Sequence, residues 1–255
     1  MSNQIAKGLI SFVTAGDPNL TKTKEWIELL CEYSDFVEVG IPFSDPVAEG
    51  EVIEAANMRA LDAGVTTDKV FCMLNKLSIP PGNPCKVIIL TYINSVFSYG
   101  FERFAAKCRE CKVFGLVIPD LPYEEREELK VHTDRYGIRL IPLVSPVSYS
   151  RITKLCKDAD PEGFVYLVSS LGTTGVREDL NTADMVKNIK AIKAVTDAPV
   201  YVGFGVSTPE QAVRIREQSD GVIVGSAIVR LIEKYGDNAG DKIKKLVKSL
   251  SKNII

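Results

Sequence analysis

The chain has 255 residues, of which 45% are hydrophobic and 25% are charged, and its formal net charge is -2. This is the composition of a globular protein that is large enough to fold without disulfides, and it lacks the basic balance typical of nucleic-acid binding. The first residues hold no apolar stretch long enough for a signal peptide or a membrane span, so we expect a cytoplasmic protein with reduced cysteines.

Short apolar runs rich in valine and isoleucine alternate with longer amphipathic segments. Eight runs qualify as strands, at residues 8–15, 36–40, 86–91, 115–118, 139–144, 163–168, 200–203 and 221–224. They are continuously apolar, as are strands of a parallel sheet that is buried on both faces. Eight strand–helix units in this length favour a single α/β domain over residues 1–255, an eight-stranded parallel (β/α)8 TIM barrel. A doubly wound open sheet is the alternative.

The segments between these runs carry helical spacing. Trp26, Leu29, Leu30 and Tyr33 fall at positions i, i+3, i+4 and i+7, which predicts a helix with one apolar face. Residues 208–211 read Thr-Pro-Glu-Gln, with a capping threonine, a proline for the first turn and a glutamine that can close a capping box. We therefore predict that another helix begins there.

Cys108 and Cys111 form a CxxC pair. A zinc site needs two more ligands, and the only histidine, His132, lies far away in the sequence. We interpret the cysteines as helix residues and His132 as part of an exposed, charged helix. We predict no metal site.

Glycines end the last two predicted strands, at Gly203, Gly205 and Gly225. The active site of a barrel lies at the C-terminal ends of its strands, and phosphate often binds after strands seven and eight. Ser226 opens the following helix, whose free N–H groups and dipole favour an anion. We predict a phosphate site here; the alternative is that the glycines only form tight turns.

An acidic residue, Glu38, lies inside an apolar predicted strand. Burial favours the neutral carboxyl, and a raised pKa would suit Glu38 to acid–base chemistry near neutral pH. The alternative is a side chain that points outward to a lysine or arginine on a helix. Glu49 follows in the next loop, on the same side of the barrel. The pattern alone leaves open whether Glu49 is a loop-end charge or a substrate ligand.

The loop after the sixth predicted strand, residues 169–177, is small, polar and rich in glycine. Such a loop can close over a ligand and exclude water, or it can be a plain flexible connection. Phe12, Tyr92, Tyr166 and Phe204 end or line predicted strands. They can form the floor of an aromatic ligand site or simply fill the barrel.

Residues 37–46, VEVGIPFSDP, closely resemble the tryptophan synthase α-subunit family, and the resemblance spans nearly the whole chain. It implies a lyase that cleaves indole-3-glycerol phosphate into indole and glyceraldehyde 3-phosphate, with no metal or cofactor of its own. It also implies docking on a β subunit that carries pyridoxal phosphate, in an α2β2 complex. The loops at residues 45–46 and 120–122 would lie on the contact face.

The resemblance also implies roles for individual residues. Glu38 matches the catalytic glutamate, Glu49 matches a second catalytic carboxylate that binds the indole N–H, and Tyr166 matches a tyrosine near the reacting centre. The other matches are Gly175, Gly205, Gly225 and Ser226 for the phosphate, Phe12, Leu90 and Phe204 for the indole pocket, and Thr174 and Arg177 for a lid.

Several positions depart from the family pattern. Glu49 is one methylene longer than the usual aspartate, which we expect to shift the carboxylate by about 1 Å. Glu51 and Glu54 replace proline and glutamine at the next helix start; they suit the helix dipole, but they crowd like charges near Glu38. We therefore keep an alternative, a weakly active or inactive α-like subunit that binds and allosterically activates the β subunit.

Two further departures concern the ends of the barrel. Residues 169–171 replace an arginine-rich stretch of the lid, and only residues 1–7 precede the first predicted strand. We expect a shortened N-terminal extension and a barrel floor that is less well covered.

Overall fold

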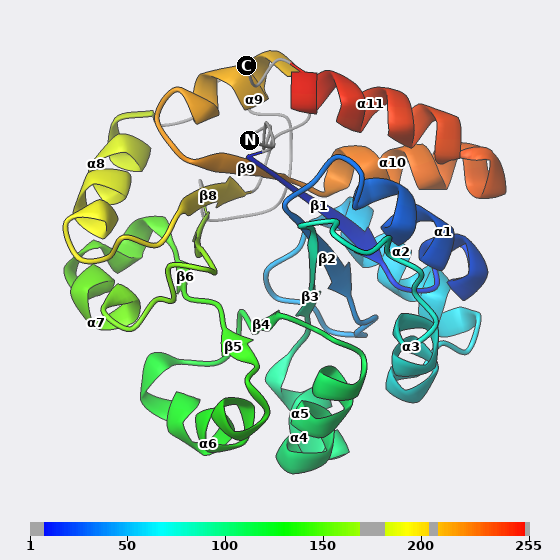
Figure 1. The fold of residues 1–255 in the computed structure, drawn as a ribbon, viewed down its shortest axis with the longest axis horizontal. Helices are drawn as coiled ribbons and strands as arrows, with labels where there is room; N and C mark the ends of the chain where they lie inside the picture. Colours follow the sequence, from blue (N-terminus) through cyan, green and yellow to red (C-terminus); the bar gives the residue numbers. More distant parts are fainter. Residues whose placement is uncertain (1–7, 169–181, 204–208, 253–255) are drawn as a thin grey trace.

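A computed structural model of the protein describes residues 8–168, 182–203 and 209–252. Figure 1 shows a curled sheet surrounded by helices. The strands are β1 (Leu9–Thr14), β2 (Phe36–Gly40), β3 (Lys86–Leu90), β4 (Gly115–Val117), β5 (Arg139–Leu140), β6 (Leu143–Val144), β7 (Val165–Val168), β8 (Val200–Gly203) and β9 (Gly221–Val224). The α-helices are α1 (Leu20–Leu30), α2 (Glu51–Asp62), α3 (Thr67–Leu74), α4 (Ile93–Tyr99), α5 (Phe101–Glu110), α6 (Arg126–Tyr136), α7 (Ile152–Cys156), α8 (Thr182–Lys193), α9 (Pro209–Arg216), α10 (Ser226–Tyr235) and α11 (Gly240–Lys252).

The strands are parallel, in the order β5-β4-β3-β2-β1-β9-β8-β7-β6. All C-terminal strand ends therefore lie along one edge of the sheet. Three predicted strands, at residues 36–40, 200–203 and 221–224, have the observed bounds, and others are shorter by one or two residues. In the part of the chain that is described, no helix is long and apolar enough to cross a membrane.

The predicted fifth strand, at residues 139–144, is two short strands in the structure, so the sheet has nine strands instead of eight. The N–H of Ile141 donates to the carbonyl of Leu116 in β4 at 2.9 Å. The carbonyl of Pro142 accepts from the N–H of Tyr166 in β7, also at 2.9 Å. Proline has no N–H to donate, which interrupts a regular ladder at this position.

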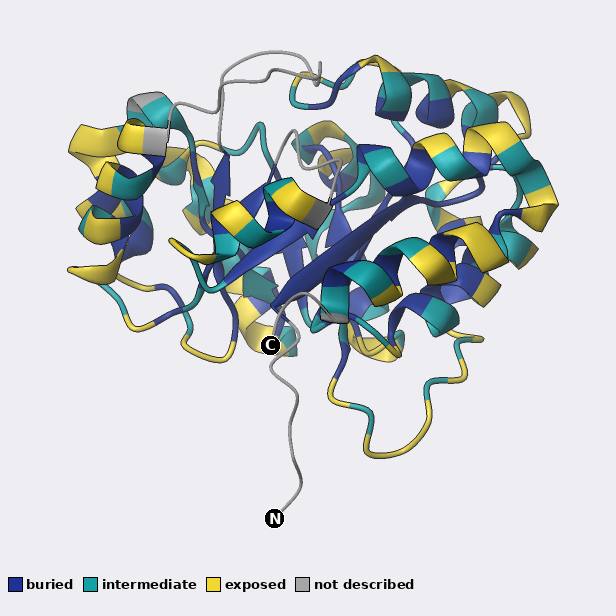
Figure 2. Ribbon diagram, turned by 90° about the horizontal axis from the view of Figure 1, so that it is seen from above, coloured by how far each residue is buried: buried dark blue, intermediate teal, exposed yellow. Residues whose placement is uncertain are grey.

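The strands bury both faces, as their apolar runs predict. One apolar cluster joins the outer face of the sheet to the surrounding helices, including Leu30, Phe71 and Phe104. A second cluster fills the inside of the curled sheet, where alternate residues of each strand point. Figure 2 shows the buried strands at the centre, with exposed residues on the outer helix faces.

Aromatic rings fill the N-terminal end of the curled sheet. The ring of Phe36 lies 5.0 Å from that of Phe164 and 5.5 Å from that of Phe114. The cationic groups of Lys86 and Arg139 lie 4.1 Å and 4.2 Å from the Phe114 ring. These side chains line the floor of the barrel. Residues 1–7 lie outside the described residues, so the expectation of a less well covered floor stays a prediction.

A buried ion pair holds together the elements that frame the C-terminal edge. Asp17, in the loop after β1, accepts two hydrogen bonds from Arg59 of α2, at 2.9 Å and 2.8 Å. Arg59 also contacts Glu233 of α10 at 3.2 Å. The loop after β1, α2 and α10 are thereby fixed relative to one another at this edge.

The expectations for the cysteines and the histidine hold in part. Cys108 is buried in α5, and Cys111 caps the end of that helix. His132 is in α6, as expected for a helix residue, but it is half-buried and its Nδ1 lies 2.7 Å from Glu102. The predicted cap Thr208 lies outside the described residues, and α9 begins at Pro209.

Candidate active site

Glu38 is a buried carboxyl inside the curled sheet. It points to the same face of β2 as Phe36, which belongs to the interior cluster, and it lies opposite Phe12 in the neighbouring strand β1. Its side chain is 1% exposed, and its Oε1 has no hydrogen-bond partner among the described residues. Burial, and then the negative charge of Glu49, raise the pKa of Glu38 to about 8. The structure therefore contradicts the alternative in which Glu38 points outward to a helix cation.

Glu49 is the second buried carboxyl, at the end of the loop that joins β2 to α2. It is 7% exposed, and the Tyr92 hydroxyl donates a hydrogen bond to its Oε2. Burial raises the pKa of Glu49, whereas the Tyr92 hydrogen bond and two backbone N–H groups lower it. The charge of Glu54 raises it further. Because Glu49 affects the pKa of Glu38, the two carboxyls predicted to share one side of the barrel do lie near each other.

Tyr166 is the third residue of this group. It lies in β7, belongs to the interior cluster and is 5% exposed. Burial, and then the charges of Glu38 and Glu49, raise the pKa of its hydroxyl well above the ordinary value. Tyr166 is therefore a neutral tyrosine close to both carboxyls.

Apolar side chains surround the carboxyls. Phe12 and Leu90, the two described members of the predicted indole pocket, belong to the same interior cluster as Tyr166. A methyl group at Gly40 would stand 2.8 Å from the Phe12 ring, and one at Gly225 would stand 3.3 Å from it. The Phe12 ring therefore lies between the C-terminal ends of β2 and β9, next to the predicted phosphate site.

Gly225 and Ser226 form the N-terminus of α10, directly after β9. The carbonyl of Gly225 accepts the first helical hydrogen bonds, from Ile228 at 2.9 Å and Val229 at 3.0 Å. The N–H groups of Ser226 and Ala227 precede these bonds and have no acceptor in a previous turn. No acidic residue lies in the first turn. The geometry thus fits an anion at this helix end.

The glycines at this edge also have a packing role that neither sequence interpretation included. A methyl group at Gly203 would stand 2.6 Å from the Tyr166 ring, and Gly225 is in contact with Phe12. Gly225 has φ −116°, a value open to any residue. A side chain at this position would therefore crowd Phe12, whereas the backbone conformation itself does not call for glycine.

Five predicted site residues lie outside the described residues: Thr174, Gly175, Arg177, Phe204 and Gly205. The structure does describe two aspartates in loops at this edge. Asp120 accepts a hydrogen bond from the N–H of Ile93, the first residue of α4, at 2.9 Å. Asp45 accepts from the Ser44 hydroxyl at 2.5 Å.

Sequence reasoning missed the contact between Tyr92 and Glu49. Tyr92 follows β3 and was expected only as an aromatic floor or filler. Its ring is 2% exposed and stacks on Phe43, with 4.8 Å between centroids. A tyrosine at the C-terminal end of a strand, next in space to a loop that holds a carboxylate, is the available signal. The sequence does not show which loop atom the hydroxyl reaches.

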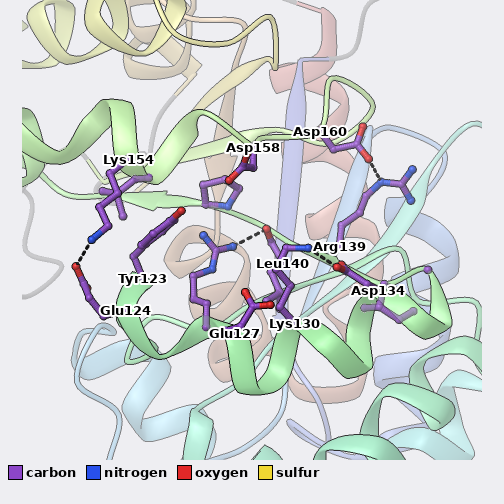
Figure 3. Close-up of a pocket in the computed structure, with 15 residues that line it drawn as sticks. Tyr123, Glu124, Glu127, Lys130, Asp134, Arg139, Leu140, Lys154, Asp158 and Asp160 are labelled. Atoms are coloured by element: carbon purple, nitrogen blue, oxygen red, sulfur yellow. Dashed lines mark hydrogen bonds and ion pairs between the residues drawn. The ribbon is translucent and has the colours of Figure 1, made fainter.

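A cavity of about 770 Å³ lies away from this site, on the outside of the sheet between α6 and α7. Figure 3 shows its charged lining, in which Lys154 pairs with Glu124 at 2.8 Å and Arg139 with Asp160 at 2.5 Å. None of the predicted site residues lines it. The buried carboxyls at the C-terminal edge therefore remain the candidate active site.

Comparison with known proteins shows which family the chain resembles. The model of the family described as "Tryptophan synthase alpha chain" matches residues 1–254. The tryptophan synthase alpha chain of Thermoanaerobacter sp. (strain X514) is 42% identical over 96% of this chain and 92% of its own length. That of Lacticaseibacillus casei is 44% identical over 96% and 90%.

The same family has the same fold. A chain from the tryptophan synthase a2b2 complex of Pyrococcus furiosus superposes with a TM-score of 0.84 at 30% identity, covering 96% of this chain and 97% of that one. The match of the family model and the identity to these relatives extend over nearly the entire sequence. The chain therefore belongs to the tryptophan synthase alpha chain family.

Proposed function

We propose that the chain is the α subunit of tryptophan synthase and cleaves indole-3-glycerol phosphate into indole and glyceraldehyde 3-phosphate, a step of tryptophan biosynthesis. The observation that carries this proposal is the pair of buried carboxyls, in which Glu38 has a pKa of about 8 and lies near Glu49. Such a carboxyl can both give and take a proton near neutral pH, as a retro-aldol cleavage requires.

In the proposed reaction, protonated Glu38 gives its proton to C3 of the indole ring. Glu49 accepts a hydrogen bond from the indole N–H and stabilises the positive charge that forms on the ring nitrogen. The Glu38 carboxylate then takes the proton of the hydroxyl on the carbon bonded to C3. The bond between the two carbons breaks, its electrons return to the ring, and the hydroxyl carbon leaves as the aldehyde. Glu38 ends the cycle protonated.

The remaining residues would bind and orient the substrate. Gly225 and Ser226, together with Gly175 and Gly205, would hold the phosphate through N–H groups and the α10 dipole. Tyr166 would contact the reacting centre through its neutral hydroxyl. The walls of the indole pocket would be Phe12, Leu90 and Phe204, and the lid would include Thr174 and Arg177.

We infer that residues 139–144 act as one fifth strand that closes an eight-stranded barrel, in a single domain spanning residues 1–255. The support is that β5 and β6 form the two edges of the sheet and are joined by only Ile141 and Pro142. Ile141 bonds to β4 on one side and Pro142 to β7 on the other. The same segment thus contacts both neighbours.

The proposed chemistry needs only proton transfer by carboxyls, so we infer that the chain uses no cofactor of its own. Pyridoxal phosphate would belong to the partner β subunit. Dialysis of the purified chain against a metal chelator should leave indole release unchanged. A loss of activity that a divalent metal restores would contradict this inference.

We infer that the chain works in the cytoplasm and assembles with a β subunit, since a relative from Pyrococcus furiosus belongs to a tryptophan synthase a2b2 complex. An apolar groove of about 350 Å³ lies between α4 and α6, beside the loop at residues 120–122. Phe97, on its rim, is 68% exposed, and Val47, after the loop at residues 45–46, is 76% exposed. Exposed large apolar residues at one edge are typical of a protein interface.

The deciding experiment measures indole released from indole-3-glycerol phosphate by the chain with and without its β subunit. We expect activity in the parent and none in Glu38→Gln, with β-subunit binding equal in both. Equal turnover in the two proteins would overturn the role of Glu38. An inactive parent that still stimulates the β subunit would establish the alternative, an α-like activator.

A further inference from the structure

Glu49 reaches the site from a long loop, so its position depends on what holds that loop. The loop covers residues 41–50 between β2 and α2, and its residues 44, 45 and 47 are exposed. The carboxylate itself is buried. A buried side chain at the end of such a loop needs a fixed partner in the rigid part of the fold if its carboxylate is to meet a ligand in one geometry.

Tyr92 provides that partner. Its hydroxyl oxygen accepts hydrogen bonds from the N–H groups of Val47 at 3.0 Å and Ala48 at 3.1 Å. The same hydroxyl donates a hydrogen bond to the Glu49 carboxylate. A single phenol thus contacts three consecutive residues of the loop. The two accepted bonds also fix the direction in which the hydroxyl can donate, which is toward Glu49.

The Tyr92 ring is held as firmly as its hydroxyl. It is 2% exposed, lies two residues after the end of β3 and stacks on Phe43 with an angle of 20° between the ring planes. The ring is therefore fixed near the end of β3, and its hydroxyl restrains the loop relative to that strand. The hydroxyl and the carboxylate belong to residues 43 positions apart in the sequence.

We propose that Tyr92 is a positioning residue that holds the Glu49 carboxylate in place and ionised for the indole N–H. The inference rests on the proposed function and adds a residue that acts on the substrate through Glu49. Without this hydroxyl, the carboxylate would lose its side-chain donor, and the N–H groups of Val47 and Ala48 would lose the acceptor that they share.

Among the described residues, the charged and titratable groups that act on Glu49 come from several elements. Glu54 of α2 raises the pKa of Glu49, and the Tyr92 hydrogen bond lowers it, as do the backbone N–H groups of Glu49 and Ala48. Glu38 of β2 and Tyr166 of β7 lie close enough for the Glu49 charge to raise their own pKa values. Loss of the Tyr92 hydroxyl should therefore raise the pKa of Glu49, since a donor to the ionised form disappears.

The test is Tyr92→Phe, which keeps the stacked ring and removes only the hydroxyl. Its matched control is Tyr136→Phe, because the Tyr136 hydroxyl also donates to a glutamate, Glu102, at 2.6 Å, on the outside of the molecule. The first readout is the titration of the Glu49 carboxyl carbon by NMR in glutamate-labelled protein. We expect a higher midpoint in Tyr92→Phe than in the parent or the control.

The second readout is the affinity for indole-3-propanol phosphate, a substrate analogue without the hydroxyls needed for cleavage, measured by calorimetry. We expect Tyr92→Phe to weaken binding at least ten-fold in the parent background and less than two-fold in a Glu49→Gln background. The third is kcat/KM for indole release against pH. Its acidic limb should move to higher pH in Tyr92→Phe, because Glu49 must be ionised to accept the indole N–H.

An unchanged Glu49 titration, or an equal loss of affinity in both backgrounds, would overturn the proposal. Should Tyr92→Phe fail to fold, Glu49→Gln in the parent supplies the second variant. The Tyr92 ring should then lose its restraint by Glu49, seen as a changed Tyr92 hydroxyl resonance, and an unchanged resonance counts against the proposal. A parent that neither binds the analogue nor cleaves the substrate refutes the proposed function, whereas the Glu49 titration still decides the role of Tyr92.

Discussion

Glu38 shows how a buried carboxyl lowers the stability of the fold that holds it. Its pKa is raised from 4.5 to about 8 in the folded chain, so ionisation favours the unfolded chain. The free energy of unfolding should therefore be unaffected by Glu38 below pH 4.5 and should decrease as the pH rises to 8. One pKa unit corresponds to about 1.4 kcal/mol, so the total effect is on the order of a few kcal/mol.

We predict that Glu38→Gln becomes more stable relative to the parent as the pH is raised from 5 to 9, since the amide cannot ionise. Urea unfolding at both pH values measures the difference in the free energy of unfolding. The control is Glu51→Gln, at an exposed carboxylate in the first turn of α2. A stability difference between Glu38→Gln and the parent that stays constant across this range would show that Glu38 is not buried in its neutral form.

A second prediction concerns the packing of Tyr166 against Gly203. A methyl group at Gly203 would stand 2.6 Å from that ring, which is buried and has little room to move. We expect Gly203→Ala to destabilise the chain by about 1–3 kcal/mol and to lower kcat/KM, because Tyr166 is displaced beside the carboxyls. Gly240→Ala, where the nearest atom is 3.9 Å away, is the control in both assays. Equal behaviour of the two variants would refute the contact.

At residue scale, the burial of Glu38 could be predicted because its neighbours on both sides in the strand are apolar. The proximity of Glu49 followed from the parallel topology, which brings all strand ends to one edge. The bond between Tyr92 and Glu49 could not be predicted. It depends on the path of a ten-residue loop, and no local pattern encodes which backbone N–H groups that loop turns toward the tyrosine.

At the scale of elements, most strands could be predicted because buried parallel strands are continuous apolar runs bounded by polar residues. The division of the fifth predicted strand could not, since Ile141 and Pro142 are apolar and fit the run. Pro142 lacks an N–H, and the segment exchanges one neighbouring strand for the other at this point. The division depends on which strand each backbone group bonds to, and the hydrophobic pattern of the sequence does not show this.

The N-terminus of α10 gives a prediction at the same scale. A negative charge in the first turn stabilises a helix by about 0.3–1 kcal/mol, but it repels a phosphate bound at the same end. Ala227→Asp should therefore raise KM for indole-3-glycerol phosphate at least ten-fold. Ala227→Asn has the same shape without the charge and serves as the control. If both variants have the same KM, the phosphate does not bind at this helix end.

At the scale of the whole molecule, the candidate active site and the groove proposed to bind a partner lie in different places. The interior cluster and the carboxyls lie within the curled sheet, whereas the apolar groove lies on its rim between α4 and α6. The ion pair of Asp17 with Arg59 fixes α2 to the loop after β1, and Glu233 links α10 to the same arginine. A partner bound at the rim would thus contact loops attached to the site without replacing any residue in it.

The last prediction tests this separation. Phe97 is 68% exposed on the rim of the groove, and a charge there would have to be desolvated when a β subunit covers it. We expect Phe97→Asp to weaken β-subunit binding at least ten-fold, measured by sedimentation velocity at several partner concentrations. The isolated variant should retain the affinity of the parent for indole-3-propanol phosphate. Val131→Asp, at a 52% exposed position on α6 outside the groove, is the control. If it weakens binding as much as Phe97→Asp, the groove is not the interface, and charge alone accounts for the effect.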